Sequence, residues 1–130
     1  MFKLGSDRAW VVYGAGGLDE ISTVGHTKVS ELHRGAVNTF YVHPADAGIP
    51  LASVEDVRGG TAAENARMIE DVLSGVAGAR RNIALLNAGA ALLIAGEATS
   101  LGDGVERAAA SIASGAAKNV LTRLRESGRA

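Results

Sequence analysis

The sequence contains no cysteine. This absence excludes disulfide bonds, thiol nucleophiles and zinc–thiolate sites. It also fits a reducing compartment, so we expect a cytoplasmic protein. Aromatic residues are scarce as well, at 4% of the chain, whereas glycine occurs 17 times. Such a composition favours close packing of backbones over bulky side-chain contacts.

The chain also lacks an excess of charge of either sign. Its net charge is −1 over 130 residues, which argues against a nucleic acid or an anionic membrane surface as partner. Residues 1–7 lack the apolar core of a signal peptide. The apolar run at 83–95 is short for a membrane span and contains Asn87 and Gly89. With 47% hydrophobic and 21% charged residues, we expect one globular domain over 1–130.

The residue pattern predicts an α/β fold with a small mixed sheet of about three strands followed by three helices. A β-branched and aromatic run predicts a strand at 9–13. Two further runs flank Arg34-Gly35-Ala36 and predict a hairpin of strands at 27–33 and 37–43. Residues 53–56 fit one helical turn. Apolar stripes predict helices at 61–75, 80–95 and 101–126, the first capped by Thr61 and Glu64 and the last by Ser100 and Asp103.

The helix at 80–95 is apolar on nearly every face. Asn87 inside it requires a hydrogen-bond partner if it is buried. Three strands cover only one side of such a helix, and their sheet would have unpaired edges. We therefore expect association with a second copy or with a further polypeptide segment. The alternative is that the alanine-rich helices cover one another.

The most informative stretch is Trp10–Glu20, where an apolar run stops at a glycine cluster and two adjacent acids follow. Glycines allow backbone angles that other residues avoid and let a ligand approach the main chain. In open α/β sheets ligands bind beyond the carboxyl ends of strands. Asp19 and Glu20 would lie at such an end and could hold Mg²⁺, which is usually bound by one or two carboxylates with phosphate and water.

Other interpretations of these residues remain open. Asp19 or Glu20 could cap a helical turn at 21–23, an interpretation that residue chemistry alone slightly favours. The glycines resemble a dinucleotide fingerprint, but an acid replaces its third glycine and no long helix is predicted after it. Capping or solvation is the simpler role for the remaining polar candidates, which are Ser22, Thr23, His26, His33, His43, Arg80 and Arg81.

Five segments together resemble anthranilate phosphoribosyltransferase in order and spacing. They are Val11–Ser22, Glu64–Ala66, Gly75–Gly78, Leu86–Leu92 and Ala98–Gly104. The resemblance implies a partial phosphoribosyltransferase catalytic domain. It implies transfer of phosphoribosyl from phosphoribosyl pyrophosphate (PRPP) to anthranilate in tryptophan biosynthesis, with Asp19 and Glu20 as Mg²⁺ ligands. Tyr13 departs from the family, which usually has histidine there.

The resemblance covers only the C-terminal portion of the family. The family's glycine-rich diphosphate loop, its Lys-His-Gly-Asn segment and its anthranilate-binding arginine do not occur in these 130 residues. The resemblance therefore assigns no catalytic residue to this chain and leaves its substrate-binding residues unknown. We expect the isolated chain to be inactive, and to form a homodimer or to associate with the missing N-terminal segment. The alternative is a non-catalytic, self-associating remnant of the enzyme.

Overall fold

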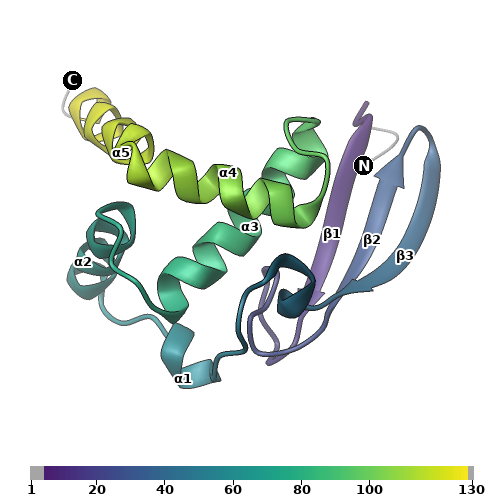
Figure 1. Ribbon diagram of the computed structural model, residues 1–130, viewed down its shortest axis with the longest axis horizontal. Coiled ribbons are helices and arrows are strands. Elements are labelled where there is room, and N and C mark those ends of the chain that lie inside the picture. Colours follow the sequence, from purple (N-terminus) through teal and green to yellow (C-terminus); the bar gives the residue numbers. More distant parts are fainter. Residues whose placement is uncertain (1–4, 129–130) are drawn as a thin grey trace.

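The computed structural model describes residues 5–128. Three strands form one sheet in the order β1-β2-β3: β1 (Arg8–Gly14), β2 (Thr27–His33) and β3 (Ala36–Val42) (Figure 1). The α/β class and the three strands are confirmed. A mixed sheet was expected, but within the described residues both pairings are antiparallel. Arg34 and Gly35 form the predicted hairpin turn with φ angles of 50° and 79°, as a type I′ turn requires.

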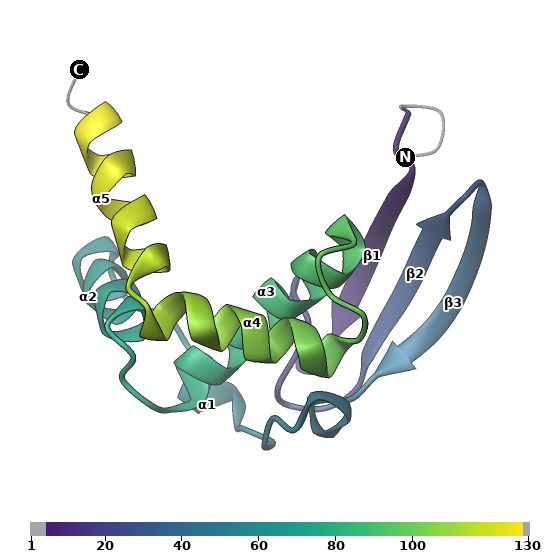
Figure 2. The ribbon, with the colours of Figure 1, turned by 45° about the horizontal axis from the view of Figure 1, so that its top comes forward.

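Helices make up the second half of the chain, after the short 3-10 helix η2 (Pro44–Ala47). They are α1 (Val54–Val57), α2 (Ala62–Leu73), α3 (Ala79–Ala95), α4 (Leu101–Ala113) and α5 (Ala116–Ser127). The prediction of one helix over 101–126 was wrong, because Gly115 adopts a left-handed φ of 80° and divides it. Figure 2 shows α5 leaving α4 at a steep angle.

Capping hydrogen bonds confirm the predicted starts of α2 and α4. Thr61 Oγ1 accepts from the Glu64 amide at 3.3 Å, and Glu64 Oε2 accepts from the Thr61 amide at 2.7 Å. Ser100 Oγ accepts from the Asp103 amide at 3.1 Å in α4. These bonds satisfy amides that have no partner within the helix, which is why these two helices begin where their caps lie.

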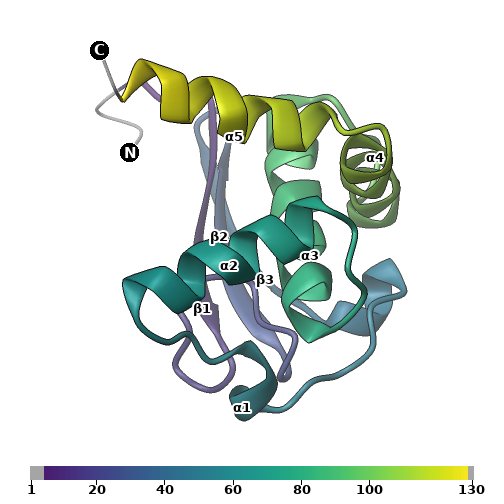
Figure 3. The same cartoon turned by 90° about the vertical axis from the view of Figure 1, so that its left-hand side faces the viewer.

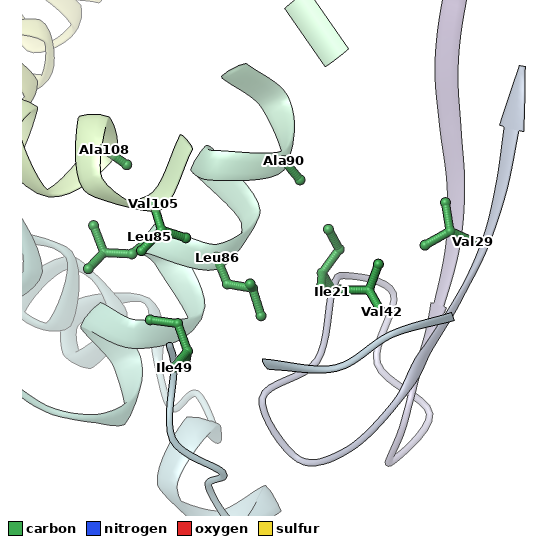
Figure 4. Packing of buried hydrophobic residues seen from close by; sticks show 9 residues of the cluster. All are labelled: Ile21, Val29, Val42, Ile49, Leu85, Leu86, Ala90, Val105 and Ala108. Carbon is green, nitrogen blue, oxygen red and sulfur yellow. The ribbon is translucent and has the colours of Figure 1, made fainter. Parts of the chain in front are cut away.

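The core lies between the sheet and α3, and α4 packs on α3 (Figure 4). The helices approach closely at Gly89 of α3 and Gly104 of α4: a Cβ on Gly89 would lie 2.7 Å from the Val105 nitrogen. Both glycines are buried. The core side chains come from strands, loops and both helices: Ile21, Val29, Val42, Ile49, Leu85, Leu86, Ala90, Val105 and Ala108.

Most of the exposed large apolar side chains lie outside α3. Every leucine and isoleucine of α3 is buried or half-buried, and only an alanine face of this helix, Ala88, Ala91 and Ala95, stays uncovered. By contrast, α2 and α5 contain no buried residue and lie on the side of the molecule away from the sheet (Figure 3). The outer face of the sheet, opposite the core, exposes Val11, Tyr13, Val37 and Tyr41 to between 59% and 69%.

Among the helices of residues 5–128, none combines the length and apolar character that a membrane span needs.

Candidate functional site

The chain turns sharply where β1 ends. Gly14 accepts a hydrogen bond from the Gly17 amide at 3.2 Å and donates its own amide to Leu18 at 2.9 Å. Gly16 and Gly17 have φ angles of 82° and 76°, a conformation that favours glycine. This turn places Asp19 directly after the strand end, as the glycine cluster predicted.

Gly14 itself is required for a different reason, which is space. A Cβ at this position would lie 2.5 Å from the Glu20 carbonyl oxygen and 2.9 Å from the Ser22 Cβ. The segment that carries the two acids therefore folds back across the last residue of β1. Any side chain at Gly14 would push this segment away.

Buried hydroxyl groups fix the loop behind the acids. The Ser22 amide donates to Thr27 Oγ1 at 2.8 Å, and Ser22 Oγ donates to the Ala15 carbonyl at 2.9 Å. Both side chains are fully buried. Residues 21–23 form no helical turn, so the interpretation of Asp19 or Glu20 as caps of such a turn was wrong. Ser22 Oγ also accepts from the Val24 amide at 2.9 Å, so Ser22 caps a turn, as the simpler interpretation expected, and anchors the loop as well.

Asn87 of α3 holds the residues that follow the acid pair. Its Oδ1 accepts from the Ile21 amide at 2.8 Å, and its Nδ2 donates to the Ile21 carbonyl at 2.9 Å. The same nitrogen lies 3.0 Å from the Ile83 carbonyl and 3.2 Å from Glu20 Oε2. The sequence indicated that Asn87 needs a partner, but only the fold could show that the partner is this loop.

The two acids differ in their surroundings. Asp19 is exposed and Glu20 is half-buried. Burial raises the pKa of the Glu20 carboxyl above its ordinary value, and the neighbouring Asp19 charge raises that pKa further. The negative charge of Asp19 thus disfavours ionisation of Glu20, and a bound cation would offset this effect.

The remaining polar candidates do not join this pair. His43 caps η2, its Nδ1 accepting from the Ala45 amide at 3.2 Å, and its ring lies 4.7 Å from that of His26. Arg80 donates to the Arg58 carbonyl at 3.2 Å. The glycine turn after β1 leads into a loop, so it does not form a dinucleotide fingerprint. Among residues 5–128 no cluster of three or more His, Asp or Glu could enclose a metal.

Curated proteins similar to this chain match it over nearly its whole length. Anthranilate phosphoribosyltransferase from Azorhizobium caulinodans is 54% identical over 121 residues, which are 93% of this chain and 35% of that protein. The enzyme of the same name from Parvibaculum lavamentivorans is 50% identical over 94% of this chain and 36% of its own length. The chain therefore spans about a third of the curated relatives that it matches.

Solved structures also match nearly the whole of this chain and about a third of their own length. Anthranilate phosphoribosyltransferase from Thermus thermophilus superposes with a TM-score of 0.83 and 34% identity, covering 94% of this chain and 36% of that one. The Saccharomyces cerevisiae enzyme in complex with PRPP and Mg superposes with a TM-score of 0.79 and 28% identity, over 87% of this chain and 33% of that one. The family model described as "Glycosyl transferase family, a/b domain" matches residues 1–118, and the chain belongs to this family.

Proposed function

We propose that this chain is the magnesium-binding portion of an anthranilate phosphoribosyltransferase, which transfers phosphoribosyl from PRPP to the amine of anthranilate. The names of its relatives support this assignment, because the matched proteins from several bacteria carry this activity in their names. The titles of yeast structures add PRPP with Mg, and 4-fluoroanthranilate, as molecules bound by that relative. The observation in this chain that carries the proposal is the acid pair held beyond β1.

The acid pair fits a magnesium ion better than a closed protein site. Mg²⁺ keeps several waters and is usually held by one or two carboxylates together with substrate phosphates. Asp19 and Glu20 supply two carboxylates, and residues 5–128 offer no third acid or histidine to complete a cluster. The remaining positions would be filled by water and by the diphosphate. When bound, Mg²⁺ offsets the negative charge that develops on the departing diphosphate.

This chain's residues have a limited part in the reaction. Asp19 and Glu20 would hold the cation, and Asn87 with the buried hydroxyls of Ser22 and Thr27 would keep the loop in place. The groups that grip the diphosphate and anthranilate belong, by the family resemblance, to the segment upstream. We therefore expect no turnover by the isolated chain.

The proposal includes a partner for the outer face of the sheet. Val11, Tyr13, Val37 and Tyr41 share this face, because Tyr13 and Tyr41 both pair with Lys28 in the register. Lys28, Ser30 and Thr39 lie on the same face, and exposed apolar side chains gathered among polar ones in this way are typical of an interaction site. The relatives are about three times as long as this chain, so the occupant we assign is the upstream part of the same enzyme.

Reconstitution tests this function. The chain is mixed with the separately produced upstream two thirds of the Azorhizobium caulinodans enzyme, and loss of anthranilate is followed with PRPP and Mg²⁺. We expect turnover only in the mixture, and a loss of about 100-fold or more for Asp19→Asn. Glu106→Gln, at an exposed position on α4, is the matched charge control and should retain the activity.

Two results would oppose the proposal in different ways. A complex that forms without turnover, or a stable homodimer that excludes the upstream part, would favour the non-catalytic remnant. Turnover that survives both Asp19→Asn and Glu20→Gln would show that the acid pair does not hold the cation. Val11→Lys should weaken the assembly with the upstream part, since it adds a second lysine, besides Lys28, to the face that the upstream part would cover.

A further inference from the structure

The side chain of Asn87 is fixed in one orientation by what surrounds it. Ile21 presents an amide N–H to Oδ1 at 2.8 Å, so the acceptor end of the side chain must point to Ile21. The NH₂ group is then directed at the carbonyls of Ile21 and Ile83 and at Glu20 Oε2. With the amide turned over, the NH₂ group would face the Ile21 N–H, and Oδ1 would face the three oxygen atoms that accept from Nδ2.

We infer that Asn87 is a positioning residue: it holds the Glu20 carboxylate by one oxygen and leaves the other oxygen to take a divalent cation together with Asp19. This inference rests on the proposed function and deepens it. Groups behind a metal ligand orient it, and their loss weakens metal binding even though they never touch the ion. Asn87 reaches this role from α3, 67 residues away along the chain.

The chemistry of an amide suits this position. A lysine or arginine would pair with Glu20 and compete with the cation, whereas an acid would repel Glu20. A neutral donor holds the carboxylate in place and leaves its charge available to the ion. The hydrogen bonds from Asn87 to the Ile21 backbone add precision. Ile21 follows Glu20 directly and is only 3% exposed, so its side chain anchors this part of the loop in the core.

The experiment compares two variants that each remove an anchor of the same loop. Asn87→Ala removes the contact with Glu20, and Thr27→Val removes the acceptor for the Ser22 amide without touching either acid. Mg²⁺ is titrated into the labelled 130-residue chain, with and without inorganic pyrophosphate, and amide NMR shifts of residues 18–21 give Kd. Side-chain couplings of Glu20 report whether its side chain keeps one rotamer.

We expect Asn87→Ala to weaken Mg²⁺ binding about ten-fold and to average the Glu20 couplings, while Thr27→Val, which loosens the same loop, weakens binding by about three-fold or less and leaves Glu20 in one rotamer. Unchanged Mg²⁺ affinity in Asn87→Ala, equal losses in both variants, or averaged Glu20 couplings in the wild type would each overturn the inference. If the wild type binds no Mg²⁺ but its Glu20 couplings still depend on Asn87, the positioning stands and the magnesium function fails.

Discussion

The crossing of α3 and α4 gives the sharpest test of how this chain is packed. At Gly104 an added Cβ would lie 2.8 Å and 2.9 Å from the carbonyl carbon and Cα of Gly89, and closer still to its carbonyl oxygen. These are backbone atoms, so no rotamer change can make room for a methyl group. Gly104→Ala must therefore push the two helices apart.

The size of the effect follows from two opposing terms. Overpacking of a tight core typically costs up to about 3 kcal/mol, and here the neighbour that must move is a helix backbone. Replacing glycine by alanine inside a helix returns about 1 kcal/mol. We expect Gly104→Ala to lower the free energy of unfolding by about 2 kcal/mol.

Gly102 is the matched control, since it lies two residues earlier in α4 and its nearest neighbour would be Ser100 Oγ at 3.9 Å. Gly102→Ala should leave stability unchanged or raise it by up to about 1 kcal/mol. Urea unfolding followed by circular dichroism at room temperature measures both variants. A Gly104→Ala chain within about 0.5 kcal/mol of the wild type would show that α3 and α4 are not in backbone contact.

Three further predictions concern single side chains. Thr61→Ala removes the cap of α2 and should cost about 1 kcal/mol, seen as fraying in the helical circular dichroism signal. The hydrogen bond from Trp10, ahead of other causes, lowers the pKa of Glu31 below 4.5 in the folded chain. The stability that ionised Glu31 contributes is therefore present above pH 4.5 and is lost as the pH falls through this lowered pKa. Glu31→Gln lacks this titration, so its free energy of unfolding should fall less on acidification. Burial, and then the Asp19 charge, raise the pKa of Glu20 in the folded chain, so stability falls as the pH rises from 4.5 through this raised pKa. Glu20→Gln should therefore be more stable than the wild type at neutral pH, by about 0.5 kcal/mol in urea unfolding, because the half-exposed group is partly screened. Below pH 4.5 the gain should be small.

Local signals in the sequence were enough to predict most elements. The hairpin followed from a glycine turn between two β-rich runs, and the start of α2 from the spacing of Thr61 and Glu64. These features depend on neighbours within a few residues. The division at Gly115 was missed because the apolar stripe continues in sequence on both sides of it, and a single glycine within a helical pattern is compatible with either outcome.

Longer-range features could not be predicted in the same way. Residue chemistry singled out Asn87 as a group that needs a partner, yet nothing local specified that Ile21 and Glu20 would supply the partners. The exposed side chains on the outer face of the sheet were also not predicted. The composition of α3 showed that it must be buried, but the covering contribution of α4 depends on Gly104 meeting Gly89, which is a tertiary contact.

The close crossing of the helices and the candidate site are connected through α3. Gly89 faces α4, and Asn87, two residues earlier and therefore about 200° away around the helix, faces the loop of Glu20. A displacement of α3 from α4 is then transmitted to Asn87. We expect Gly104→Ala to weaken Mg²⁺ binding several-fold, up to the loss of about ten-fold expected for Asn87→Ala, and Gly102→Ala to leave it unchanged. The same NMR titration measures both variants. If Gly104→Ala is destabilised but binds Mg²⁺ as the wild type does, α4 moves instead, and the core of α3 with the sheet holds the site in place independently.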